Sequence, residues 1–322
     1  MNNKLKIPLR LSLAGGGTDV EPYAGQFGSE ILNFTIDRFI HANILISTNN
    51  FFAISINDDP TSDFARKLSA AIVNWGLDIG FLIPKNIHLS LQTPVRPGSG
   101  LGASSAMVVA SISLLNEYFS LGMTKKEIAL KAIHLERYIM NIEGGFQDQF
   151  SATFTGFNFI KFHNGKYEIS TLAISESFVN EFNSSLLVLD LGIDRRGEDI
   201  IQDQTKRVIS NKSKTIEALH AQKELVSEMV MALQEENITK LGTLLDKAWK
   251  IKRNFSPRIS TREIDLLHEL LISNGAYGMK VSGAGGGGHI FALIQPERRQ
   301  SLISIIENAG ITLVNSSIYR SL

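Results

Sequence analysis

Three glycine-rich segments have a composition that suits binding chemistry: "LAGGGTD" at residues 13–19, "PGSGLGASS" at 97–105 and "SGAGGGGH" at 282–289. A loop with few side chains that leads into a helix exposes backbone N–H groups, and the positive end of the helix dipole lies behind them. The middle segment has this form, because the apolar run from Ala106 to Phe119 predicts a helix directly after it. We therefore predict an anion site at residues 97–105.

The familiar nucleotide motifs do not describe these segments. None matches G-x-x-x-x-G-K-[ST], and no acidic residue follows the second segment where a dinucleotide ribose would need a partner. A lone glycine segment usually marks an ordinary turn, whereas three such segments, each beside a strand-like run, are difficult to explain as turns. Glycine also permits positive φ. We expect valine at Gly100 or Gly102 to obstruct a bound phosphate without unfolding the chain.

Charge and composition exclude several classes of function. The chain has 32 basic and 32 acidic residues, so it lacks the broad positive surface of a nucleic-acid-binding protein. The absence of cysteine excludes disulfides, thiolate zinc sites and cysteine nucleophiles. No apolar run approaches the length of a membrane span, and no signal-peptide pattern opens the chain. We expect a cytoplasmic protein with neither nucleic-acid nor membrane partners.

The elements that must position the glycine segments are of mixed type. A length of 322 residues favours two lobes, which we divide into 1–190 and 191–322. Strands and helices without a regular βαβ rhythm favour the α+β class. Helices are expected at 62–75, 104–120 and 124–140, the last with a capping box at Thr124 and Glu127. The stretch "FSATFTGFNFIKF" at 150–162 is expected to be a strand.

In order and spacing, the three segments resemble the three motifs of the GHMP kinase superfamily, which includes galactokinase, homoserine kinase and mevalonate kinase. "PGSGLGASSA" is similar to its P-x-x-x-G-L-G-S-S-A phosphate loop, with Ala103 in place of a small hydroxyl residue. "KVSGAGGGG" resembles its third motif. Within the superfamily, "PLRLSLAGGGTD", "GGFQDQFSATFTGFNF" and "SGAGGGG" most resemble the D-glycero-D-manno-heptose 7-phosphate kinases.

The resemblance implies a two-lobed GHMP-kinase-like fold with an ATP cleft between an N-terminal α/β lobe and a C-terminal α+β lobe. It implies ATP and Mg²⁺ as cofactors and transfer of the γ-phosphoryl to the anomeric hydroxyl of a heptose 7-phosphate. Phosphoryl transfer depends chiefly on positioning and charge neutralisation, to which a loop of backbone amides is suited. The ATP-binding residues would be Pro97, Gly98, Ser99, Gly100, Leu101, Gly102, Ala103, Ser104 and Ser105.

The resemblance assigns catalysis to Asp148 and Arg10. Asp148, expected between a glycine pair and a strand, would be the general base, although a turn or cap aspartate is the simpler alternative. Arg10, expected near the end of the first strand, would lie between the base and the γ-phosphate, unless it is an edge charge. For Mg²⁺ the predicted ligands are Ser105 and Glu136. A solvated Glu136 paired with Arg137, or Glu143 as the ligand, are the alternatives.

Substrate binding is predicted at two of the glycine segments and at one basic pair. In similar kinases an aspartate in the position of Asp19 grips sugar hydroxyls, while its alternative role is the N-cap of a helix at 20–25. Arg195 and Arg196 could bind an acceptor phosphate or form a solvated turn. The predicted set is Gly16, Gly17, Thr18, Asp19, Arg195, Arg196, Gly285 and Gly286.

Several functions remain open from the sequence. Within the fold they are a kinase for another sugar such as L-fucose or galactose, a diphosphate decarboxylase, and an inactive nucleotide-binding module. Outside it, a Rossmann oxidoreductase is the general alternative for glycine-rich loops. The expected partner is a sugar or sugar-phosphate substrate. The sequence is also compatible with a homodimer.

Overall fold

The computed structural model describes residues 3–47, 51–192 and 197–321, and the chain divides into two compact units. Both units are discontinuous in sequence. Unit 1 comprises Met1–Leu9, Arg38–Pro97 and Gly102–Phe154, and unit 2 comprises Arg10–Asp37, Gly98–Leu101 and Thr155–Leu322. The compact units therefore do not follow the predicted boundary between residues 190 and 191, which stays a prediction about functional lobes. Helices and strands are mixed in both units, as the α+β prediction requires.

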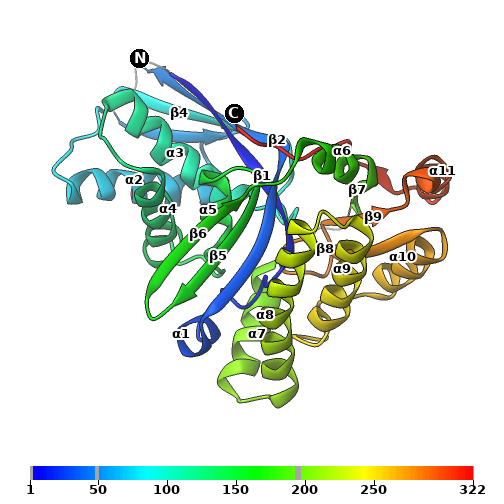
Figure 1. Ribbon diagram of the computed structural model, residues 1–322. Helices are drawn as coiled ribbons and strands as arrows, with labels where there is room; N and C mark the ends of the chain where they lie inside the picture. Colours follow the sequence, from blue (N-terminus) through cyan, green and yellow to red (C-terminus); the bar gives the residue numbers. More distant parts are fainter. Residues whose placement is uncertain (1–2, 48–50, 193–196, 322) are drawn as a thin grey trace. The chain divides into compact units, whose positions relative to one another are not determined.

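Unit 1 combines a small sheet with several helices (Figure 1). The second half of β2 (Ser29–Ile46) pairs antiparallel with β4 (Ile87–Gln92), from His41 opposite Gln92 to Ile46 opposite Ile87. Strand β3 (Ala53–Ile56) pairs with β4 in parallel. The first residues of β1 (Lys4–Ala14) also belong to unit 1. Its helices are α2 (Asp63–Asp78), α3 (Ala103–Phe119), α4 (Lys125–Ile133), the π-helix η1 (His134–Ile139) and α5 (Gln147–Thr153).

Helix α3 is the central helix of unit 1. Every residue from Ser105 to Leu115 is buried, so the helix is enclosed on all sides, as its nearly uninterrupted apolar sequence requires. Gly102 caps its N-terminus in the left-handed conformation at φ +78°, and Ser120 ends it in the same conformation. The helices α2, α4, η1 and α5 all contact α3, and side chains of η1 and α5 bond to its first turn.

The segment after α3 differs in part from the prediction. The capping box of Thr124 and Glu127 is confirmed. The predicted helix at 124–140, however, becomes π-helical at His134. The predicted strand at 150–162 is wrong at its start, because α5 occupies Gln147–Thr153 and the strand begins only at Phe157. Phe146 and Phe150 are four residues apart and both buried, which is helical spacing.

Unit 2 contains a hairpin, a second sheet and most of the helices (Figure 1). Strands β5 (Phe157–His163) and β6 (Lys166–Leu172) form the hairpin, and β5 also pairs antiparallel with the first half of β2. The second sheet has the order β10-β7-β9-β8. Its strands are β7 (Leu186–Asp190), β8 (Ala276–Val281), β9 (His289–Ile294) and β10 (Thr312–Leu313). The helices are α1 (Tyr23–Phe27), α6 (Glu176–Ser185), α7 (Gly197–Ile209), α8 (Ser213–Gln234), α9 (Ile238–Lys252), α10 (Arg262–Ser273), η2 (Pro296–Arg298) and α11 (Arg299–Asn308).

Close packing of α9 on β8 positions two lysines of unit 2. A Cβ atom at Gly278 would collide with the carbonyl oxygen of Gly242, so the helix and strand backbones touch where both residues lack side chains. Lys252 is the last residue of α9, and Lys280 lies on β8.

In the part of the chain that the structure describes, no helix is both long and apolar enough to cross a membrane.

Candidate active site

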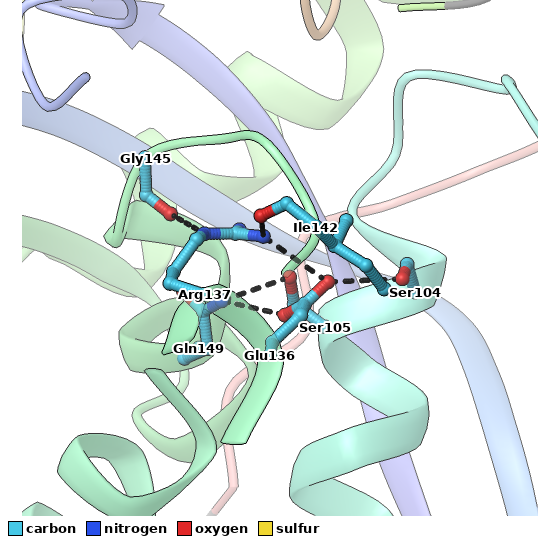
Figure 2. Close-up of polar contacts among 7 residues, drawn as sticks. All are labelled: Ser104, Ser105, Glu136, Arg137, Ile142, Gly145 and Gln149. Atoms are coloured by element: carbon cyan, nitrogen blue, oxygen red, sulfur yellow. Dashed lines mark hydrogen bonds and ion pairs between the residues drawn. The ribbon is translucent and has the colours of Figure 1, made fainter. Parts of the chain in front are cut away.

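Glu136 is the centre of a polar cluster within unit 1 (Figure 2). Its side chain is only 1% exposed, on the π-helix η1, an element that often occurs at functional sites. Ser104 Oγ donates to Oε1 at 2.9 Å, and Gln149 Nε2 donates to Oε2 at 2.6 Å. Arg137 Nη1 lies 3.4 Å from Oε1. The alternative of a solvated charge is therefore wrong as to solvation, although the pairing with Arg137 exists.

Ser105 belongs to the same cluster. Its hydroxyl accepts a hydrogen bond from Gln149 Nε2 at 3.2 Å, and the residue is 2% exposed in the first turn of α3. Three elements therefore meet here: α3 contributes the serines, η1 contributes Glu136, and α5 contributes Gln149. The two predicted magnesium ligands, 31 positions apart in sequence, share one hydrogen-bond donor.

The donor set of this cluster suits magnesium. Mg²⁺ prefers oxygen ligands and is usually held by one or two carboxylates together with substrate phosphates. The cluster supplies one buried carboxylate and two hydroxyls. Within residues 3–47, 51–192 and 197–321 no group of three or more His, Cys or acidic residues could hold a metal unaided, so phosphate oxygens would have to complete the coordination. Glu143, the rival ligand, is exposed on the loop before α5.

Asp148 lies in the first turn of α5 and is half-buried, rather than between a glycine pair and a strand as predicted. The loop before it is fixed by Arg137, whose Nε donates to the Gly145 carbonyl at 2.8 Å and whose Nη1 donates to the Ile142 carbonyl at 3.2 Å (Figure 2). Arg137 thus connects Glu136 to the loop that leads to the helix carrying the predicted base. The role of Asp148 as base stays a prediction.

Arg10 is buried in unit 2, with 4% of its surface exposed, and it is not an edge charge. Its Nη1 donates to the Gly100 carbonyl at 2.6 Å and lies 3.3 Å from Ser282 Oγ. Ser282 Oγ in turn donates to the same carbonyl at 2.8 Å. The guanidinium therefore joins the second glycine segment to the third.

The second and third glycine segments pack backbone against backbone within unit 2. Gly98 and Gly100 have φ of +74° and +77°. A Cβ at Gly288 would lie 2.7 Å from the Ser99 carbonyl oxygen, and His289 N donates to that same oxygen at 3.1 Å. The glycines thus permit close backbone approach in addition to positive φ. The predicted phosphate loop spans both units, since residues 98–101 belong to unit 2 and the rest to unit 1.

This packing corrects the expectation for valine at position 100. A Cβ at Gly100 would lie 2.5 Å from the Ser282 carbonyl oxygen, a rigid backbone atom. We expect Gly100→Val to destabilise the protein, because the strained positive φ alone costs on the order of 1–3 kcal/mol and the clash adds to it. Urea denaturation would measure the loss. An unchanged denaturation midpoint for Gly100→Val would contradict the close packing seen here.

Lys280 is a fully buried lysine in unit 2. Its Nζ donates to the Ser12 carbonyl at 2.7 Å. Burial holds the pKa of Lys280 well below its usual range, and the neighbouring charges of Lys252 and Arg10 lower that pKa further. Lys252 is itself buried and donates to the Gly283 carbonyl. Three cationic side chains therefore gather beside the third glycine segment, an arrangement that a bound anion would stabilise.

We expect the stability difference between Lys280→Met and the parent to depend on pH. The parent's unfolded chain binds this proton up to about pH 10.5, whereas the folded state releases it at lower pH. The parent's free energy of unfolding therefore rises with pH between the folded and unfolded pKa values, and the variant lacks this contribution. The variant-minus-parent difference should fall as pH increases toward 10.5. Urea titrations of both proteins across this range would show it, and a constant difference would contradict a depressed pKa.

The predicted sugar-binding residues of the first glycine segment form a tight turn in unit 2. Asp19 Oδ1 accepts from Gly17 N at 3.0 Å, and Thr18 Oγ1 donates to the Gly15 carbonyl at 2.7 Å. Helix α1 begins at Tyr23 with Pro22 at its N-cap, so the N-cap alternative for Asp19 is wrong. Substrate binding by Gly16, Gly17, Thr18 and Asp19 stays a prediction.

The structure does not test substrate binding by the other four predicted residues, which are Gly285, Gly286, Arg195 and Arg196. Gly286 N donates to the Ile259 carbonyl at 2.8 Å, and Gly285 packs against the same residue, so the backbone of this part of the third segment is already engaged. Arg195 and Arg196 lie outside the described residues. Their binding of a phosphate stays a prediction.

Sequence reasoning overlooked Gln149, Lys252 and Lys280. Gln149 directly follows the predicted base in "FQDQF", and Lys280 lies two positions before the third glycine segment in "MKVSGAGGGG". Adjacency to a motif was the available signal in both cases. For Lys252, inside an amphipathic helix pattern, we see no comparable signal.

Comparison with known proteins identifies the class. The family model for the GHMP kinases N terminal domain matches residues 47–156, and the model for the GHMP kinases C terminal domain matches residues 229–312. The chain is 33% identical over 315 residues to D-glycero-alpha-D-manno-heptose 7-phosphate kinase of Campylobacter jejuni, covering 94% of this chain and 92% of that protein. The chain belongs to the GHMP kinase family and is a small-molecule kinase.

Solved structures give the same class at the level of the fold. A D-glycero-D-manno-heptose 1-phosphate kinase from Bacteroides thetaiotaomicron has a TM-score of 0.79 at 26% identity, over 98% of this chain and 95% of that chain. A putative sugar kinase from Campylobacter jejuni has a TM-score of 0.77 at 30% identity, over 99% and 96% of the two chains. The expected GHMP-kinase-like fold is confirmed.

Proposed function

We propose that this kinase transfers the γ-phosphoryl group of ATP to the anomeric hydroxyl of D-glycero-D-manno-heptose 7-phosphate. The products are the 1,7-bisphosphate, which would feed the synthesis of nucleotide-activated heptose, and ADP. The observation that carries the proposal is the 33% identity, along 94% of the chain, to a kinase named for this acceptor. The buried arginine and lysines beside the third glycine segment support it, since Arg10 offers positive charge to a phosphoryl group and a bound anion would favour the protonated form of Lys280.

In the proposed reaction Asp148 accepts the proton of the sugar hydroxyl. The hydroxyl oxygen forms a bond to the γ-phosphorus, and the bond from that phosphorus to the bridging oxygen breaks, so ADP leaves. A carboxylate suits this step, because in a loose transition state the hydroxyl becomes acidic late and a strong base is unnecessary. Arg10 would stabilise the charge on the phosphoryl oxygens in transit.

Magnesium, when bound, would neutralise negative charge on the ATP phosphates. Glu136 and Ser105 would hold it, since both belong to one buried cluster of oxygen atoms. Ser104 donates to Glu136 and so keeps one carboxylate oxygen in place. Arg137 fixes the loop that leads to Asp148.

The acceptor can be tested by an ATP-consumption assay with five compounds: the heptose 7-phosphate, the heptose 1-phosphate, the free heptose, L-fucose and galactose. Both phosphate positions are included, because the names of the two relatives differ in that position. We expect the 7-phosphate to give the highest kcat/KM, with a new anomeric phosphate visible by ³¹P NMR. A preference for an unphosphorylated sugar would overturn the proposed acceptor.

The recognition of the acceptor's phosphate can be tested separately. Arg195 and Arg196 are the candidates from the sequence, because arginine binds phosphate oxygens bidentately. Changing both to alanine should raise KM for the 7-phosphate selectively over KM for the free heptose. Equal effects on both acceptors would leave the phosphate to other basic residues.

A further inference from the structure

We propose that Gln149 is a positioning residue that holds Glu136 and Ser105 in place for the magnesium–ATP complex and ties the helix carrying Asp148 to both. This inference rests on the proposed function, because it assumes that these residues face a metal–nucleotide. All the groups concerned belong to unit 1, and Figure 2 shows Gln149 together with Glu136 and Ser105.

The hydrogen bonds of Gln149 define its role. Its Nε2 donates to Glu136 Oε2 at 2.6 Å and to Ser105 Oγ at 3.2 Å. An ionised carboxylate only accepts hydrogen bonds, so the amide nitrogen rather than the amide oxygen must face Glu136. One NH₂ group thus contacts both predicted metal ligands. Removing it would release Glu136 Oε2 and the Ser105 hydroxyl from their shared donor, while Ser104 would still hold Glu136 Oε1.

The other end of the amide is unsatisfied. Gln149 Oε1 is buried and has no hydrogen-bond partner within the described parts of the chain, and the residue is 0% exposed. An unsatisfied buried acceptor destabilises a protein, and a glutamine with a purely structural role would be expected to satisfy both ends of its amide. Magnesium usually retains several waters, each of them a hydrogen-bond donor. The unpaired oxygen is therefore suited to the hydration shell of a bound cation.

Gln149 also positions the predicted base. Helix α5 has seven residues, and among the residues that the structure describes no side chain caps its N-terminus. It is held by the buried Phe150 and by the hydrogen bonds of Gln149 to η1 and α3. Asp148 immediately precedes Gln149, so a shift of the helix would move the base together with the metal ligands. Gln149 thus acts through its neighbours rather than on the reacting atoms.

The first test replaces Gln149 with methionine, which has similar length and no hydrogen-bonding amide. Ser151→Ala is the matched control, because Ser151 is equally buried on α5 and its hydroxyl donates to the Gln147 carbonyl within the same helix. Binding of Mn²⁺ with a non-hydrolysable ATP analogue is followed by electron paramagnetic resonance. We expect Gln149→Met to weaken metal binding about 10–100-fold, the usual effect of removing a partner of a metal ligand, and the control to leave it unchanged.

If Gln149→Met does not fold, a second variant tests whether residue 149 lies beside the bound cation. Gln149→Glu preserves size but places a second carboxylate against Glu136, so a cation should relieve the repulsion. We expect Mn²⁺ and the analogue to raise Tm more in this variant than in the parent. An equal or smaller rise, or unchanged metal affinity in Gln149→Met, would overturn the inference.

The two proposals can fail separately. Metal–nucleotide binding needs no acceptor, so a wrong acceptor would leave the metal readouts of Gln149 intact. Conversely, normal metal binding by Gln149→Met in an enzyme that phosphorylates the heptose 7-phosphate would remove the positioning role alone. A parent that binds no Mn²⁺ with the analogue would overturn the magnesium assignment and this inference together.

Discussion

Asp148→Asn is expected to lower kcat by about 10²–10⁴-fold, the usual contribution of a positioned proton acceptor, while binding of ATP persists. The substitution preserves the size of the side chain and removes its charge and basicity. Single-turnover assays with the preferred acceptor would measure the loss, and calorimetry with a non-hydrolysable ATP analogue would measure nucleotide binding. Turnover within threefold of the parent would transfer the role of base to another residue.

The fold should tolerate Asp148→Asn. Asp148 lies in the first turn of α5, where an acidic residue contributes on the order of 0.3–1 kcal/mol through the helix dipole. Asp63→Asn is the matched control, because Asp63 occupies the first turn of α2, also in unit 1, with its side chain 69% exposed. Both variants should lose a similar, small amount of stability. Loss of turnover in the control as well would indicate a structural effect.

Glu136→Gln is expected to raise the magnesium concentration for half-maximal rate by about tenfold or more, because it removes the buried charge of the predicted ligand. The structure adds a second consequence. The NH₂ end of the new amide must face either Gln149 Nε2 or Arg137 Nη1, and both of these are donors. Either the hydrogen bond from Gln149 or the contact with Arg137 is therefore lost. Tm should therefore fall together with the metal affinity.

Glu143→Gln separates the two candidate ligands. Glu143 is exposed on the loop before α5, so its variant should change neither Tm nor the magnesium requirement. Magnesium titrations of both variants at saturating ATP would rank them. If Glu143→Gln showed the larger increase, the ligand would be Glu143, and Glu136 would be a structural partner of Arg137.

The family and the chemistry followed from local sequence. Three glycine segments with fixed order and neighbours indicated a GHMP kinase, and the comparisons confirm it. Helix α3 was also predictable, because an apolar run after a glycine loop allows few alternatives. The capping box of Thr124 and Glu127 was also predictable, because it depends only on two residues three positions apart.

Local patterns failed where distant packing decides conformation. From Phe150 to Thr153 the residues of α5 alternate in polarity like a strand, yet Phe150 is buried and Gln149 bonds to η1 and α3, and these contacts favour a helix. The π-helix at His134–Ile139 was likewise not predicted, because the spacing of apolar residues in this stretch indicated a regular α-helix. Backbone contact between Gly100 and Ser282 joins positions 182 apart, so the sequence alone could not show that valine would clash there.

The sequence by itself determined the class of enzyme, the glycine segments and the candidate base and metal ligand, because these depend on residue type and short spacing. Only the tertiary structure decided that Glu136 is buried, that Ser104, Ser105 and Gln149 contact it or one another, and that Arg10, Lys252 and Lys280 gather in unit 2. The physical reason is that burial and hydrogen bonding between distant segments depend on how whole helices and strands pack. The spacing of residues along the chain does not predict that packing.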